Sequence, residues 1–148
     1  MKLFVATLIL SFGYVLVPAY SKTPLTESDK ADFQSSLLVL TECQVFYGLR
    51  TIALVEAGES KSQRYTEAIN GGLSINLLLR FITEEHLNAK GIAGYNKFLK
   101  ARMAEAVEEY QPQSPKALDN LYNIEISNKI SGCDAIINDS AELLGRMQ

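Results

Sequence analysis

The chain has 148 residues, of which 47% are hydrophobic and 21% charged, with four prolines and nine glycines. This composition is that of an ordinary globular domain and is too apolar for a disordered chain. The sequence contains no repeat of 20 to 50 residues and no low-complexity tract, which argues against a solenoid or a collagen-like protein. Its net charge of −3 disfavours nucleic acid and anionic membranes as partners, because both attract proteins with an excess of cations.

The first 21 residues have the order of a secretory signal peptide. Lys2 precedes an apolar run from Leu3 to Val17, and small residues follow at Ala19 and Ser21. These small residues fit cleavage after Ser21. The alternative is an uncleaved membrane anchor, but the run of about 15 residues is shorter than the roughly 20 that span a bilayer. The sequence therefore predicts a signal peptide over residues 1–21 and a protein that is periplasmic or secreted.

The mature chain, residues 22–148, is predicted to form a single helical domain. Loss of Lys2 leaves 13 basic against 17 acidic residues, a net charge of −4. No later membrane span is expected, because the longest apolar candidate, Leu73 to Ile82, is interrupted by three polar residues.

The apolar periodicity of the mature chain is helical almost everywhere. A first helix is expected from about 27 to 57, with Thr26 or Ser28 as its N-cap and Gly58 as its stop. A second helix starts at Ser60 or Ser62 and ends around residues 88–91.

Gly71 and Gly72 interrupt the interior of the second helix. Each glycine costs roughly 1 kcal/mol there relative to alanine, so the pair marks either a break or a close helix contact. The apolar positions keep one phase across the pair, which favours a continuous helix. The same pair is where we would expect a cavity for a small apolar ligand, if the protein has one.

The third helix is predicted from about Ile92 to Tyr110, and Pro112 ends it. Ser114 and Pro115 are typical of a helix start and predict a fourth helix that finishes near Gly145. The predicted fold is therefore all-α: an antiparallel four-helix bundle with up-down-up-down topology and short connections.

The two cysteines are expected to form one inter-helix disulfide. Cys43 and Cys133 each lie near the middle of a long predicted helix, and the first and last helices of such a bundle are antiparallel neighbours. A redox-active or metal-binding pair is the alternative. The 90-residue separation and the absence of a Cys-x-x-Cys motif argue against it.

The residues available for catalysis are few. His86 is the only histidine, and its place at the predicted end of the second helix favours a solvated position there. The common metal, haem, phosphate-binding and serine-nucleophile motifs are absent. We therefore expect no enzyme, no metal and no cofactor. An enzyme that uses only carboxylates and tyrosines is the remaining alternative.

The charges of the third helix oppose the helix dipole. Glu105, Glu108 and Glu109 lie in its last turns, where cations are favoured, and Arg102 is close enough in sequence to pair with Glu105. A solvated charged face explains this arrangement. The functional interpretation is an acidic patch that binds a basic surface on a partner protein, because local rules are often broken where function demands it.

Two functions follow from these observations. The first is an exported, non-enzymatic helical protein that binds another protein in the envelope or outside the cell. A periplasmic inhibitor, such as an immunity protein against a cell-wall-degrading toxin, has this size, export signal and single disulfide. The second is a carrier or sensor that holds a small apolar ligand within the bundle.

Overall fold

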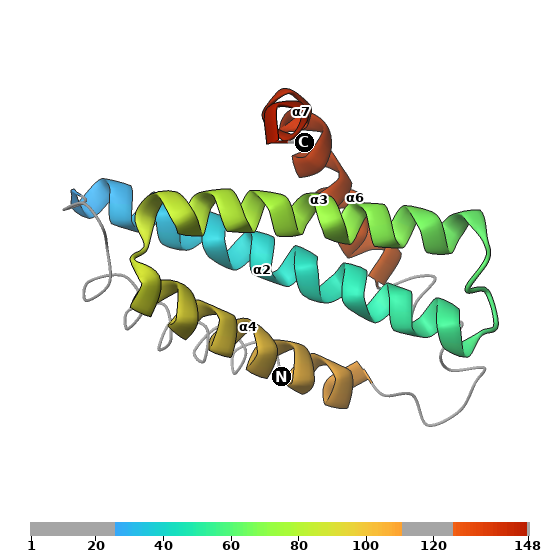
Figure 1. Cartoon of the computed structure of the whole chain (residues 1–148). Helices are drawn as coiled ribbons and strands as arrows, with labels where there is room; N and C mark the ends of the chain where they lie inside the picture. Colours follow the sequence, from blue (N-terminus) through green and yellow to red (C-terminus); the bar gives the residue numbers. More distant parts are fainter. Residues whose placement is uncertain (1–25, 111–125, 148) are drawn as a thin grey trace.

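The computed structural model describes residues 26–110 and 126–147, which form five α-helices (Figure 1). The helices are, in chain order, α2 (Glu27–Glu56), α3 (Gln63–His86), α4 (Ala89–Tyr110), α6 (Ser127–Asp139) and α7 (Ala141–Met147). The all-helical prediction is confirmed. The signal peptide over residues 1–21 and the predicted helix start at Ser114 and Pro115 lie outside the described residues.

The ends of α2 are set by local signals. The Thr26 side chain accepts the backbone N–H of Asp29 at 3.2 Å, and Asp29 Oδ2 in turn accepts the backbone N–H of Thr26, so the two residues form a capping box. At the other end, Gly58 has a φ of +76°, a conformation that glycine adopts without strain and that commonly follows a helix. Both ends lie where the sequence predicts them.

The central helix of the fold is α2, which contacts α3, α4 and α6. Buried side chains are distributed around most of its circumference. Val45 and Tyr47, which lie on different faces of the helix, and Leu49 are all at most 2% exposed. By length and composition, α2 is also the one helix in the described part of the chain that is long and apolar enough to cross a membrane. Leu73 to Ile82 is therefore not the longest apolar candidate, whereas the absence of a later membrane span stays a prediction. The same length and composition suit a core helix, and α2 has helices packed on several sides.

The second long helix, α3, is continuous through Gly71 and Gly72, as its apolar phase predicts. It begins after Ser62, whose hydroxyl accepts the N–H of Tyr65 at 3.1 Å. After α3 the chain turns sharply, because Leu87 is extended and the Asn88 side chain accepts the N–H of Gly91 at 3.0 Å. This cap explains why α4 begins at Ala89, about three residues before the predicted start.

The C-terminal part differs from the predicted fourth helix. It consists of two helices, α6 and α7, separated at Ser140. The break follows Asn138 and Asp139, and such side chains compete with the helix for backbone hydrogen bonds. In Figure 1, α6 crosses the α2–α3 pair steeply instead of lying along it, while α2 and α4 run in one direction and α3 in the other. The described residues thus contain three long helices in alternating directions and two short ones.

Candidate functional site

A trough follows α4 on the side where this helix faces α3 and α2. At its closed end, near the turn between α3 and α4, is a corner pocket of about 250 Å³; beside it lies an outer groove of about 660 Å³. Asn96 and Leu99 line both spaces, so the two lie side by side, and we call them together the α4 trough. It exists because α3 and α4 both pack on α2 and leave room between them.

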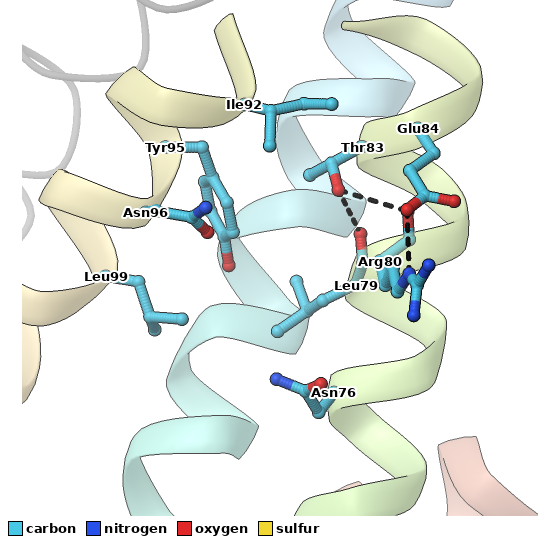
Figure 2. Close-up of a pocket in the computed structure, with 9 residues that line it drawn as sticks. All are labelled: Asn76, Leu79, Arg80, Thr83, Glu84, Ile92, Tyr95, Asn96 and Leu99. Carbon is cyan, nitrogen blue, oxygen red and sulfur yellow. Dashed lines mark hydrogen bonds and ion pairs between the residues drawn. The ribbon is translucent and has the colours of Figure 1, made fainter. Parts of the chain in front are cut away.

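The corner pocket combines apolar and polar side chains from two helices (Figure 2). Figure 2 shows the α4 residues facing the α3 residues across the space. The lining consists of Asn76, Leu79, Arg80, Thr83 and Glu84 from α3, and of Ile92, Tyr95, Asn96 and Leu99 from α4.

The two deepest polar groups of the pocket already donate their protons inside the protein. Thr83 is 4% exposed and its hydroxyl donates to the carbonyl of Leu79 at 2.8 Å. Tyr95 is 3% exposed, and its hydroxyl lies 2.9 Å from that of Thr41, which donates to the carbonyl of Leu37 at 2.6 Å. Since Thr41 has only one proton, the Tyr95 hydroxyl is the donor between them. The Thr83 and Tyr95 oxygens therefore retain acceptor capacity only.

The mouth of the corner pocket carries amides and one ion pair. Asn76 and Asn96 are exposed, and each offers both donors and an acceptor. Arg80 Nε donates to Glu84 Oε1 at 2.7 Å, and this pair is largely in water, with side chains 68% and 54% exposed. Such an exposed pair adds little stability. It leaves the rim without net charge.

The outer groove is more apolar. Leu99, Met103, Ala104 and Val107 form its α4 wall, with Lys100 and Glu108 at the edge and Gln44 of α2 on the other side. Met103 lies close to Gly48, where any added Cβ would overlap the methionine Cε. The Gln44 Oε1 atom is buried and has no hydrogen-bond partner among the described residues. An acceptor left unsatisfied in this way is unfavourable by about 1–3 kcal/mol.

The three acidic residues predicted to bind a partner are all exposed on α4, and one of them, Glu108, lines the outer groove. The predicted pairing of Arg102 with Glu105 was wrong. Arg102 instead binds Glu42 of α2 through two hydrogen bonds of 2.8 and 3.0 Å. Arg102 pairs with Glu42 because its side chain, which is 14% exposed, points from α4 toward α2. Glu105 and Glu109 are therefore left on the solvent side of this ion pair.

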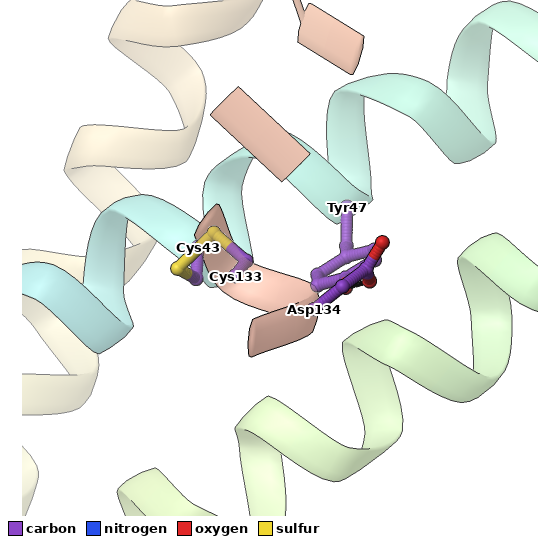
Figure 3. The surroundings of a disulfide bond; sticks show 4 residues. All are labelled: Cys43, Tyr47, Cys133 and Asp134. Atoms are coloured by element: carbon purple, nitrogen blue, oxygen red, sulfur yellow. Dashed lines mark hydrogen bonds between the residues drawn. A yellow bond between two sulfur atoms is a disulfide. The ribbon is translucent and has the colours of Figure 1, made fainter. Parts of the chain in front are cut away.

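The space beside Gly71, where we expected a ligand cavity, is occupied by the ring of Tyr47. The Tyr47 hydroxyl donates to Asp134 of α6 (Figure 3). Burial and the neighbouring Asp134 raise the pKa of Tyr47 well above its usual value. Gly71 and Gly72 thus serve a close contact between helices, and the carrier hypothesis gains no support from them.

The predicted disulfide is present between Cys43 and Cys133, with their Cα atoms 5.6 Å apart (Figure 3). Both cysteines are buried, at 3% and 4% exposed. Figure 3 shows the bond beside the Tyr47 and Asp134 pair, so α6 is joined to α2 at two adjacent points. Within residues 26–110 and 126–147, no three His, Cys, Asp or Glu side chains are grouped as a metal ion requires.

His86 lies in the last turn of α3, as predicted, but its ring is not fully solvated. Its side chain is 32% exposed, and the ring packs edge-on against Phe33 with centroids 5.0 Å apart. This contact is structural and places the imidazole outside the residues that line the α4 trough.

Searches of protein-family models, of curated proteins and of solved structures found no match to this chain. The interpretation of the site therefore depends on its geometry alone.

Sequence reasoning missed the α4 trough. Asn76 and Asn96 are single polar residues on exposed helix positions, and Gln44 lies within an apolar helix. Whether these residues face one another depends on how α3 and α4 separate after the turn that joins them. No local sequence pattern encodes this separation.

Proposed function

We propose that this is an exported, non-enzymatic helical protein that binds another protein through the α4 trough. The observation that carries the proposal is the outer groove, whose apolar wall is built by Leu99, Met103 and Val107. On its other side lies a buried Gln44 oxygen that has no hydrogen-bond partner in the described part of the chain. Specific interfaces combine an apolar centre with a few placed polar groups and a polar rim. Lys100 and Glu108 provide that rim.

The dimensions of the outer groove suit an amphipathic helix. From Asn96 to Glu108 the groove follows 12 helical steps, about 18 Å at 1.5 Å per residue. A partner helix would place apolar side chains at intervals of three and four residues into such a groove. Basic residues of the partner would face Glu108, Glu105 and Glu109.

Export is the second part of the proposal. The apolar run and small residues of the first 21 positions support a signal peptide, and a buried disulfide is typical of proteins in oxidising compartments. A periplasmic or secreted inhibitor, such as an immunity protein, is the class of protein that these features favour. N-terminal sequencing of the exported protein tests the leader: we expect the first residue to be Lys22.

Affinity capture from the envelope or secreted fraction of the source organism tests the binding function. We expect one stoichiometric protein to bind the oxidised wild-type protein and to be lost with Val107→Glu. Val39→Glu is the matched control, because Val39 is an exposed valine of α2 outside the trough and the new side chain is the same. Circular dichroism melting of both variants separates lost binding from lost folding.

Charge provides a second readout for the same partner. Replacing Glu105, Glu108 and Glu109 with lysine should slow association, and the wild-type on-rate should fall as salt is added. A partner that binds Val107→Glu and wild type equally well would disprove binding through the trough. Binding that is independent of salt would remove the acidic patch from the interface.

A further inference from the structure

We propose that the corner pocket of the α4 trough is a separate binding site for a small neutral molecule that carries a hydroxyl group on an apolar ring or branched chain. The phenols are the chemical class that fits best. The inference does not depend on the protein partner, because it concerns the closed end of the trough and needs neither Val107 nor the acidic residues.

The size of the pocket sets the size of the ligand. A cavity of roughly 150 Å³ holds benzene in another protein. The corner pocket, at about 250 Å³, accommodates one ring with a short substituent. It lies near the turn between α3 and α4 and is less open to solvent than the outer groove.

The walls supply the apolar contact. Leu79 on α3 faces Ile92 and Leu99 on α4 (Figure 2). Leu79 is almost fully buried, at 2% exposed. A ring placed between these side chains contacts apolar groups of both helices, which stabilises binding in proportion to the apolar area buried.

The buried polar atoms select the functional group of the ligand. The hydroxyl protons of Thr83 and Tyr95 are engaged inside the protein, with Leu79 and Thr41 as their acceptors. Their oxygens can therefore only accept, and a ligand O–H satisfies one of them. A carboxylate would bring a second acceptor against these oxygens and would lose its hydration without compensation.

The rim favours a neutral molecule for an independent reason. Among the described residues that line the pocket, Arg80 is the one cation, and it is paired with Glu84, so this rim carries no uncompensated charge. Burial raises the pKa of Tyr95 to about 12, so its hydroxyl is protonated at physiological pH. Asn76 and Asn96 at the mouth offer hydrogen bonds to a polar substituent on the outer side of the ring.

The test compares three probes that share an ethyl-substituted benzene ring and differ in the group opposite the ethyl: 4-ethylphenol, ethylbenzene and 4-ethylbenzoate. Each is titrated into the oxidised, ¹⁵N-labelled protein, and binding is followed by amide shifts. We expect saturable binding of 4-ethylphenol, with the largest shifts at residues 79–83 and 92–99. Ethylbenzene should bind at least fivefold more weakly, and 4-ethylbenzoate should be weaker still.

Two variants of α3 locate the site. Asn76→Phe fills the mouth from an exposed position and should weaken 4-ethylphenol binding at least tenfold. Asn70→Phe makes the same substitution at an exposed position outside the lining and should change the affinity less than twofold. Tyr95→Phe, which removes one acceptor, should reduce the preference for 4-ethylphenol over ethylbenzene.

Three results would overturn the inference: no binding of 4-ethylphenol at millimolar concentration, equal affinity for the benzoate, or shifts centred away from the corner pocket. These outcomes are distinct from failure of the protein-binding proposal, which is tested by Val107→Glu with a different ligand and at the other end of the trough.

Discussion

The ring of Tyr47 lies directly against the backbone of Gly71, at the point where α2 and α3 cross. A Cβ added to Gly71 would be 2.2 Å from Cε1 of Tyr47, far closer than carbon atoms approach. The ring cannot move aside easily, because Tyr47 is 2% exposed and its hydroxyl is bound to Asp134. Gly71 is therefore required for the contact between these two helices.

Replacement of Gly71 by alanine should destabilise the protein by about 1–3 kcal/mol, as overpacking of a buried contact does. Gly72→Ala is the matched control. Its Cβ would lie 3.5 Å from Tyr47, an ordinary contact, so the gain in helix propensity should stabilise the protein by up to about 1 kcal/mol. Urea unfolding measures both, and equal effects of the two substitutions would contradict the assigned contact.

The ion pair between Glu42 and Arg102 should contribute measurably to stability because it is partly buried. Glu42→Ala leaves the guanidinium without its two hydrogen bonds, and we expect a loss of about 1–3 kcal/mol. Glu105→Ala, which removes an exposed acid of α4, should change stability by less than about 0.5 kcal/mol. A double-mutant cycle with Arg102→Ala gives the coupling energy directly; a coupling near zero would contradict a net stabilisation by this pair.

Stability should fall between pH 10 and pH 12. The pKa of Tyr95 is about 12 in the folded protein because of burial, against an ordinary value of 10.0. Below pH 10 both states are protonated and the stabilisation is complete. Between the two values the unfolded chain loses its proton first, so folding weakens by about 1.4 kcal/mol per pH unit. Tyr47 contributes in the same direction.

The variant Tyr95→Phe tests this origin. It loses the hydroxyl, so its free energy of unfolding should decline less steeply over the same range. An unchanged slope would exclude Tyr95 as the titrating group. Thiol exchange does not interfere, since the only two cysteines of the chain form the disulfide.

Reduction of the Cys43–Cys133 bond should lower stability by up to about 4–5 kcal/mol, the loop entropy expected for about 90 residues. Thermal melts with and without dithiothreitol measure the effect. A variant with both cysteines changed to alanine should resemble the reduced protein and should not respond to the reductant. If the double variant does respond, the effect of dithiothreitol has another cause.

The long N-terminal helices could be predicted closely from the sequence because their ends depend on nearby residues. Thr26 with Asp29 begins α2, Gly58 follows its end, and Ser62 begins α3. Each signal acts within about four residues, so it can be read without knowledge of the fold. The disulfide could also be predicted, since only two cysteines were available.

The C-terminal arrangement and the site required three-dimensional information. The break at Ser140 results from weak helix formers at the end of α6. The apolar pattern continues regularly across this point, and for that reason one uninterrupted helix was predicted. The α4 trough depends on the separation of α3 from α4. The partner of Arg102 was mistaken because a residue 60 positions away, Glu42, lies closer in space than its neighbour in sequence.

The Cys43–Cys133 bond also divides the chain into a covalently closed loop and two tails. Residues 43–133 form a closed ring that contains α3 and α4, and therefore the whole α4 wall of the trough, while α7 lies on a tail outside it. A protease that cuts once within the ring opens it without dividing the molecule, and the two pieces separate only after reduction. A single cut in the tail after Cys133 ends the covalent attachment of α7, which is then held by its packing on α3 and α6. In an environment rich in proteases, the proposed binding surface is thus carried on the part of the chain that a single cut cannot release.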